Sequence, residues 1–191
     1  MTNLGILGST KGTDLQAIID AIENKLLNAK ISIVISNIEN AFILERAKKH
    51  NIKFAHISHK AKKRKYFDKE ISFLMKENDV DLILLIGFMR ILSASFCKQW
   101  RNKILNVHPS LLPKYGGGMD MDVHRQVLLN GDKKTGCTIH YVNEDVDQGP
   151  ILVQKECDVL PEDNEFTLKD KVQKLEGLAY IEAIKIFQRG L

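Results

Sequence analysis

The chain has 191 residues, of which 44% are apolar and 27% charged, and its net charge is +4. This composition excludes a disordered chain. The longest apolar run, residues 82–89, is too short to span a membrane, and the N-terminus lacks a signal-peptide pattern. Three widely spaced cysteines argue against a disulfide framework and a zinc ribbon and favour a cytoplasmic protein, and the length favours one domain, residues 1–191.

The first half of the chain alternates short apolar runs with segments that have helical apolar spacing. The predicted strands cover residues 3–7, 31–35, 52–57 and 82–86. The predicted helices cover residues 15–22, 40–51 and 66–78, the second with Asn40 as its N-cap. Strands that alternate with helices of this length predict right-handed parallel crossovers and a doubly wound sheet.

The second half has shorter elements and ends in a long amphipathic segment. The predicted strands cover residues 104–108, 135–142 and 151–159, and the predicted helices cover residues 122–129 and 167–188. Gln148-Gly149 precedes the last strand and predicts a hairpin with the strand before it. The fold class is therefore α/β, a three-layer α/β/α domain with a mostly parallel sheet and some antiparallel pairing near its end.

Residues 60–65 read Lys-Ala-Lys-Lys-Arg-Lys and hold the largest concentration of positive charge. Two interpretations stay open: a solvated helix start, or a rim that attracts an anionic small molecule. No aromatic residues are interleaved with these charges, so a nucleic acid is not predicted as a partner.

Ligands of open α/β sheets bind at the carboxyl ends of strands, where residues 8–14 form a glycine-containing turn into a helix. Free backbone N–H groups and the helix dipole at such a turn suit a phosphate. The segment matches neither a Walker A loop nor a dinucleotide fingerprint. A plain capping turn, with Thr13 or Asp14 as the cap, fits equally well, and both interpretations stay open.

Asn106 and His108 lie at the end of a predicted strand that Pro109 terminates. Because strand side chains alternate, both point to the same face of the sheet. A carboxamide and an imidazole can both donate a hydrogen bond to a tetrahedral oxyanion, and the imidazole can also carry a proton. The pair therefore favours acyl-transfer chemistry over the alternative, two satisfied polar residues at a sheet edge.

Residues 143–150 contain three acids, Glu144, Asp145 and Asp147, between two predicted strands. A solvated hairpin tip is the favoured interpretation, and the alternative brings one carboxylate to His108 to orient its ring. The spacing does not match a calcium loop, and no metal site is predicted. His140, on the preceding strand, either faces the site or is packed in the core.

Residues 106–115, Asn-Val-His-Pro-Ser-Leu-Leu-Pro-Lys-Tyr, strongly resemble a signature of the phosphoribosylglycinamide formyltransferases, a folate-dependent family of purine biosynthesis. The resemblance covers essentially the whole chain and includes residues 12–19, 87–92 and 147–151. It implies a Rossmann-like, seven-stranded α/β/α fold. It also implies formyl transfer from 10-formyltetrahydrofolate to the amine of 5′-phosphoribosylglycinamide, without a metal, a nucleic acid or a membrane, by a monomer or homodimer.

The resemblance further implies roles for individual residues. The implied catalytic residues are Asn106, His108 and Asp147. The residues implied to bind the acceptor substrate are Gly12, Thr13, Asp14, Arg64, Gly87, Met89 and Glu176. The residues implied to bind the folate are Phe88, Arg90, Ile91, Leu92, Asn106, His140, Asn143, Glu144 and Asp147. Residues 1–100 would then form the half that binds the acceptor phosphate, and residues 101–191 the catalytic and folate-binding half.

Two stretches depart from the family pattern. The loop over residues 116–124, which ends at His124, is about three residues longer than usual by comparison with that pattern. Thr13-Asp14 stands where Ser-Asn is common. The threonine keeps the hydroxyl, whereas an ionised Asp14 repels a phosphate unless its side chain turns away, for instance to cap the helix.

Three other functions are consistent with part of these features. Methionyl-tRNA formyltransferases and formyltetrahydrofolate hydrolases share the Asn-x-His-Pro motif, but the former carry a C-terminal tRNA domain and the latter an N-terminal regulatory domain. We expect neither domain, because the first strand begins at residue 3 and the closing helix reaches the end of the chain. A non-catalytic nucleotide-binding module that uses only residues 8–14 predicts no use for Asn106, His108 and Asp147.

Overall fold

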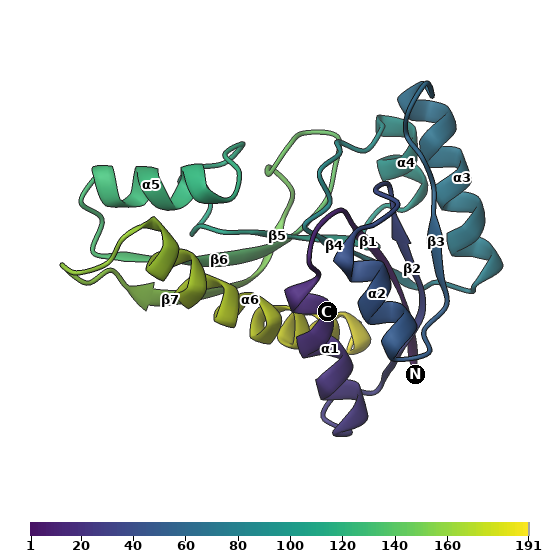
Figure 1. Cartoon of the computed structure of the whole chain (residues 1–191), viewed down its shortest axis with the longest axis horizontal. Coiled ribbons are helices and arrows are strands. Elements are labelled where there is room, and N and C mark those ends of the chain that lie inside the picture. The colour runs from purple at the N-terminus through teal and green to yellow at the C-terminus, as the bar shows by residue number, and fades with distance from the viewer. Residues whose placement is uncertain (191) are drawn as a thin grey trace.

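The computed structural model describes residues 1–190, and seven strands form one sheet. The strands are β1 (Thr2–Gly8), β2 (Ala29–Ser36), β3 (Phe54–His56), β4 (Leu82–Ile86), β5 (Ile104–His108), β6 (Lys134–Tyr141) and β7 (Ile151–Asp158). Their order is β3-β2-β1-β4-β5-β6-β7, with the first five parallel and the last two antiparallel to their neighbours. The predicted α/β class, mostly parallel sheet and late hairpin are confirmed (Figure 1).

Helices cover both faces of this sheet. They are α1 (Thr13–Glu23), α2 (Phe42–Lys49), α3 (Arg64–Glu77), α4 (Ala94–Gln99), α5 (Met121–Leu129) and α6 (Glu165–Gln188). Helix α6, yellow in Figure 1, runs along β6 and β7 and reaches α1. Within residues 1–190 no helix has the length and apolar character to cross a membrane.

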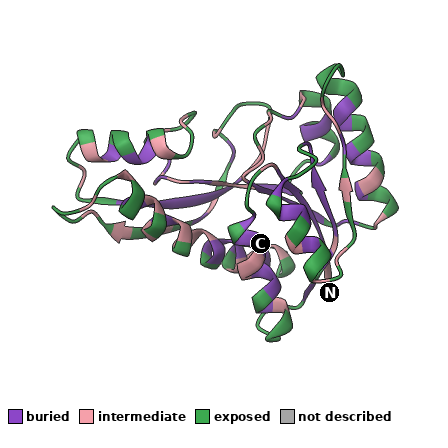
Figure 2. Ribbon diagram, viewed as in Figure 1, coloured by how far each residue is buried: buried purple, intermediate pink, exposed green. Residues whose placement is uncertain are grey.

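Strand alternation divides the interior into two cores, one on each face of the sheet. Along β4, Leu84 and Ile86 point into the core shared with α1, α2 and α6, whereas Ile83 and Leu85 point into the core shared with α3 and α4. A strand covered on both faces needs apolar residues at every position, which explains its continuous apolar sequence. Figure 2 shows the buried central strands between helices whose outer faces are exposed.

Every predicted strand and helix is present, and two details of the helices needed correction. Helix α4 was not predicted, because six residues are too short to show helical spacing; Ser93 caps it by accepting a hydrogen bond from the Phe96 N–H. The expected cap of α2 was also wrong, since Ala41 and not Asn40 holds the N-cap position.

Hydrogen bonds join the strand ends where the chain order reverses between β1 and β4. The Ser9 N–H donates to the Gly87 carbonyl (3.0 Å), and the Met89 N–H donates to the Ser9 hydroxyl (2.9 Å). The Ser9 hydroxyl in turn donates to Asn37 Oδ1 (2.6 Å), beyond the end of β2. In doubly wound sheets the crevice at this reversal is where ligands bind, so these contacts fix its walls.

Helices α1 and α6 meet at Ala17 and Gly177, where a Cβ on Gly177 would lie 2.6 Å from the Cβ of Ala17. Gly177→Ala should therefore lower the free energy of unfolding by about 1–3 kcal/mol through overpacking, despite the better helix propensity of alanine. Urea unfolding measures the change, and Ala17→Gly combined with Gly177→Ala should recover much of it. A single variant as stable as the parent protein would contradict this close approach.

Candidate active site

Four polar side chains from β5 and β6 share one face of the sheet. In the antiparallel register Asn106 pairs with His140, and His108 pairs with Thr138. The residues between them, such as Val107 and Ile139, point to the opposite face and its core. Strand alternation thus places Asn106 and His108 together, and the register adds His140 beside Asn106.

Asp147 reaches this face from the loop between β6 and β7. Its Oδ2 lies 3.2 Å from His108 Nδ1 and accepts a hydrogen bond from the Gly117 N–H (2.8 Å), and its Oδ1 lies 3.5 Å from His140 Nε2. The Asp147 side chain is 9% exposed, whereas Glu144 and Asp145 are exposed. A solvated hairpin tip therefore describes Glu144 and Asp145 but not Asp147.

The surroundings of Asp147 favour its ionised form. Burial by itself raises the pKa of this carboxyl, but the contact with His108 and the hydrogen bond from the Gly117 N–H outweigh it and hold the pKa well below its usual range. Asp147 is consequently a carboxylate at neutral pH.

His108 is 3% exposed and has oxygen atoms at both ring nitrogens. Nδ1 faces the Asp147 carboxylate, and Nε2 lies 3.0 Å from the Tyr115 carbonyl oxygen. A carboxylate and a carbonyl can only accept hydrogen bonds, so an imidazolium with hydrogen on both nitrogens would match both contacts of His108.

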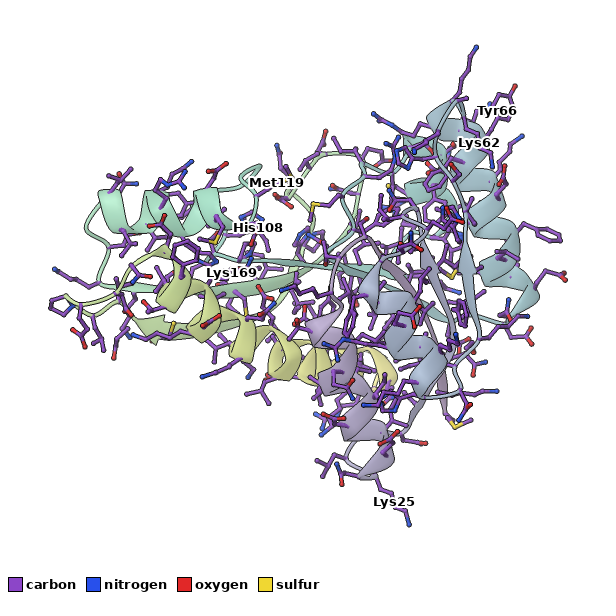
Figure 3. All side chains as sticks on the ribbon, in the orientation of Figure 1. Lys25, Lys62, Tyr66, His108, Met119 and Lys169 are labelled. Carbon is purple, nitrogen blue, oxygen red and sulfur yellow. The ribbon has the colours of Figure 1, made fainter. Side chains whose placement is uncertain are left out.

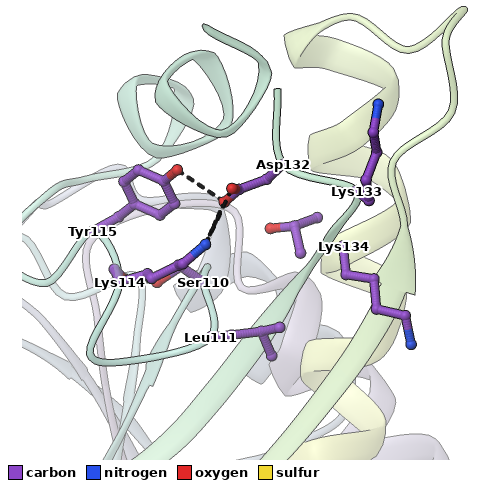
Figure 4. Close-up of a pocket in the computed structure, with 8 residues that line it drawn as sticks. Ser110, Leu111, Lys114, Tyr115, Asp132, Lys133 and Lys134 are labelled. Carbon is purple, nitrogen blue, oxygen red and sulfur yellow. Dashed lines mark hydrogen bonds and ion pairs between the residues drawn. The ribbon is translucent and has the colours of Figure 1, made fainter. Parts of the chain in front are cut away.

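Tyr115 is held at this position by its own ring and backbone. Its backbone φ of 62° lies in the left-handed region. Its hydroxyl donates a hydrogen bond to Asp132 (2.9 Å) and accepts one from Asn130 (2.8 Å). Figure 4 shows the hydrogen bond of Tyr115 with Asp132 beside a surface pocket of about 390 Å³ that Lys114 also lines. In the view of Figure 3, His108 lies inside the molecule between the labelled Met119 and Lys169.

His140 is buried, as expected for a core residue, and its ring also lies beside Asn106, as expected for a residue of the site. Its Nδ1 donates to the Tyr141 carbonyl (3.0 Å), which leaves Nε2 to accept from the Asn106 side-chain nitrogen (3.2 Å). One N–H of that carboxamide is thereby used to fix Asn106, and the second is left free to bind a ligand.

Thr138 is the fourth polar residue on this face of the sheet, and the sequence alone predicted no role for it. Its hydroxyl donates to the Ser110 carbonyl (2.7 Å) and accepts from the Leu112 N–H (3.0 Å), which fixes the turn after His108. The roles of Tyr115 and Gly117 were missed as well, although both lie in or beside the recognised signature. They act through backbone atoms, which side-chain type does not reveal.

The N-terminus of α1 does not use either predicted cap. Gly12 holds the N-cap position with a φ of 67°, and no side chain caps the helix, so neither Thr13 nor Asp14 is the cap. The first hydrogen bond of the helix runs from the Gln16 N–H to the Gly12 carbonyl (3.3 Å). The N–H groups of residues 13–15 therefore have no acceptor within the helix. Asp14 is 5% exposed, and its Oδ1 has no hydrogen-bond partner in residues 1–190.

The remaining predicted site residues lie on the loop after β4, at the start of α3, after β6 and on α6. Gly87 has a φ of 57° and lies so close to Thr10 that a Cβ would meet its hydroxyl at 2.3 Å. Phe88 and Val142 both pack against the core cluster that β4 shares with α3 and α4. Arg64 is exposed, Asn143 and Glu176 are half-buried, Met89 and Ile91 are half exposed, and Leu92 is buried.

Arg90 lies over the Phe67 ring at 5.7 Å, with its Nε buried and unpaired within the described part of the chain. Over the same residues, no group of three or more His, Cys, Asp or Glu side chains is arranged to hold a metal ion.

Comparisons with known proteins identify relatives of the whole chain. The formyl transferase family model matches residues 2–184. Phosphoribosylglycinamide formyltransferase of Escherichia coli is 37% identical over 98% of this chain and 88% of its own length. The trifunctional purine biosynthetic protein adenosine-3 of Drosophila melanogaster is 41% identical over 98% of this chain, which spans only 14% of that longer protein.

Solved structures agree with these sequence relationships. The crystal structure of glycinamide ribonucleotide transformylase 1 from Symbiobacterium toebii superposes with a TM-score of 0.94 at 36% identity, covering 100% of this chain and 89% of that one. The seven-stranded sheet is thus shared as well as the sequence. The chain belongs to the formyl transferase family, and within it to the phosphoribosylglycinamide formyltransferases.

Proposed function

We propose that this chain transfers the formyl group of 10-formyltetrahydrofolate to the amine of 5′-phosphoribosylglycinamide, in de novo purine biosynthesis. The products are the N-formylated acceptor and tetrahydrofolate. The observation that carries the proposal is the buried ion pair of His108 and Asp147 beside the fixed carboxamide of Asn106. The printed names of the relatives support the same substrates.

The chemistry needs an oxyanion site and a route for one proton. The folate co-substrate supplies an electrophilic formyl carbon when it is bound. The free N–H of Asn106 and the Nε2–H of His108 stabilise the oxyanion that forms when the amine attacks. In the structure the Tyr115 carbonyl accepts that Nε2–H, so the oxyanion takes its place and the loop after Lys114 shifts.

Asp147 has two tasks in this scheme. Its charge keeps His108 protonated, and it relays through water the proton that leaves the amine and reaches the departing N10. The new C–N bond to the acceptor forms first, and the bond from the formyl carbon to N10 breaks when the oxyanion collapses. A primary amine is already a nucleophile once deprotonated, so no covalent acyl-enzyme intermediate is needed.

We assign the two substrates to the two halves of the chain, about residues 1–100 and 101–191. The acceptor contacts Gly12, Thr13, Asp14, Arg64, Gly87, Met89 and Glu176. The folate contacts Phe88, Arg90, Ile91, Leu92, His140, Asn143 and Glu144 together with the catalytic residues. The fit is supported by apolar Ile91 at the surface and by the unpaired Nε of Arg90, since a pterin ring needs an apolar wall and hydrogen-bond partners.

We further propose that the protein acts in the cytoplasm on these small molecules, without a nucleic acid, as a monomer or homodimer. Cys97, Cys137 and Cys157 are free thiols in the described residues, which supports a reducing compartment.

A formyl-transfer assay with 5′-phosphoribosylglycinamide as acceptor tests the function. Release of tetrahydrofolate should require the acceptor. Equal release in a control without acceptor would instead make the protein a hydrolase, and no release in either reaction would support a binding module.

His108→Ala should lower kcat by at least about 100-fold, with little change in the affinity for either substrate, because a hydrogen-bond donor to the oxyanion is lost. Steady-state kinetics and equilibrium binding measure the two effects. His56→Ala, at an exposed histidine of β3, is the matched control and should behave as the parent protein. A His108 variant that retains near-normal kcat would remove this residue from the chemistry.

Asp147→Asn keeps the shape of the side chain and removes its charge, so kcat should fall by at least about 100-fold through the lost proton relay. Glu144→Gln and Asp145→Asn, at exposed positions of the same loop, should have much smaller effects. Similar small losses in all three variants would mean that Asp147 has no special part in catalysis.

Arg64→Ala should raise the KM for 5′-phosphoribosylglycinamide and leave the KM for the folate nearly unchanged. Loss of a charge-assisted hydrogen bond to phosphate costs about 1.5–3 kcal/mol, equivalent to a rise of about 10-fold or more. Lys65→Ala, at the next exposed residue of α3, is the control and should have little effect. A change in the folate KM alone would show that the two substrate sites are assigned wrongly.

A further inference from the structure

A line of hydrogen bonds connects the loop after β4 with the loop that leads into α3. The Met89 N–H donates to the Ser9 hydroxyl (2.9 Å), and that hydroxyl donates to Oδ1 of Asn37 (2.6 Å). Nδ2 of Asn37 lies 3.2 Å from Nδ1 of His59, which stands five residues before Arg64. Asn37 is 6% exposed, so the middle of this line is shielded from water.

The ring of His59 also packs on α3. It lies edge-on to the ring of Phe67, with 6.3 Å between the ring centres and 82° between the planes. The guanidinium of Arg90 lies over the same buried Phe67 ring at 5.7 Å. Met89 and Arg90, neighbours on the loop after β4, are therefore both connected to His59, one through hydrogen bonds and the other through an aromatic ring.

The direction of these hydrogen bonds decides which nitrogen of His59 carries hydrogen. A backbone N–H only donates, so Ser9 accepts from Met89 and has its own hydrogen available for Oδ1 of Asn37. Asn37 then presents its NH₂ group to Nδ1 of His59, which accepts. Nδ1 also lies 3.4 Å from the Asn37 carbonyl oxygen, but a hydrogen on Nδ1 would meet the NH₂ group donor to donor. The arrangement favours a neutral ring with its hydrogen on Nε2.

We propose that Asn37 and His59 are positioning residues for the acceptor substrate. They hold the loop of residues 57–63 against the crevice between β1 and β4, and thereby place Arg64 for the phosphate. This rests on the proposed function, which assigns that phosphate to Arg64.

The start of α3 depends on the chain before it, because Lys63 holds the N-cap position and no side chain caps the helix. Within residues 1–190, neither Asn37 nor His59 forms a hydrogen bond with Asn106 or His108. Loss of the contact should therefore weaken acceptor binding and leave the chemical step nearly intact.

Nitrogen-15 NMR at alkaline pH tests the hydrogen-bond line without any ligand. The ring of His59 in the parent protein should carry its hydrogen on Nε2. Asn37→Asp replaces the NH₂ group with an oxygen that only accepts, so Nδ1 should gain a hydrogen. His56, exposed on β3, should not respond and is the internal control. Hydrogen on Nδ1 of His59 in the parent protein, or an Nδ1 that stays bare in Asn37→Asp, would overturn the line.

Steady-state kinetics test the positioning role. His59→Leu keeps an apolar side chain against Phe67 and removes the accepting atom. The KM for 5′-phosphoribosylglycinamide should rise by about 3- to 10-fold, the size of one lost neutral hydrogen bond, while kcat changes little. His59→Asn has an accepting oxygen on its Cγ, where the ring has Nδ1, and should recover most of the parent KM. His56→Leu is the matched control and should leave both constants unchanged.

Asn37→Ala breaks the same contact from the other side and should raise the same KM, which keeps the test available if His59→Leu does not fold. An unchanged acceptor KM in these variants, or a His59→Asn variant as impaired as His59→Leu, would overturn the positioning role. A parent protein without acceptor-dependent turnover would instead overturn the proposed function and with it the role in acceptor binding. The NMR result would still decide whether the hydrogen-bond line exists.

Discussion

The ion pair of Asp147 and His108 is the interaction on which the site depends. Both side chains are largely removed from water, and a buried charge without its partner is strongly unfavourable. Each therefore requires the other, and the surrounding contacts follow from this requirement. The Gly117 N–H also donates to the carboxylate, and the Tyr115 carbonyl faces the second ring nitrogen of His108.

The sheet provides the rigid frame for this pair. Because β6 runs antiparallel to β5, His140 and Thr138 come directly opposite Asn106 and His108, and all four side chains share a face. The other half of the sheet is parallel, and there the chain order reverses between β1 and β4. One sheet thus places a crevice, the acceptor site that we propose, beside the strand pair that carries Asn106 and His108.

The sequence predicts features that depend on local periodicity. Alternation along residues 104–108 places Asn106 and His108 on one face, and the apolar run of residues 82–86 predicts a central strand covered on both faces. The family signature adds Asp147, which composition alone assigns to a solvated loop. Family resemblance thus provided the partner that periodicity could not.

Other features depend on contacts between distant segments. Helix α4 is too short for its pattern to show, and Gly12 caps α1 through its backbone conformation, where a side-chain cap was expected. The unpaired Oδ1 of Asp14 follows from the packing of α6 on α1, about 160 residues further along the chain. The position of the Tyr115 carbonyl depends on the anchor of its ring at Asp132.

The protonation state of His108 in the folded protein tests the central claim most directly. Nitrogen-15 NMR of the imidazole rings distinguishes a ring that carries hydrogen on both nitrogens from a neutral ring. At neutral pH, His108 of the parent protein should carry both hydrogens, and Asp147→Asn should convert it to the neutral form. A neutral His108 in the parent protein, or a ring that stays charged after the substitution, would contradict the account.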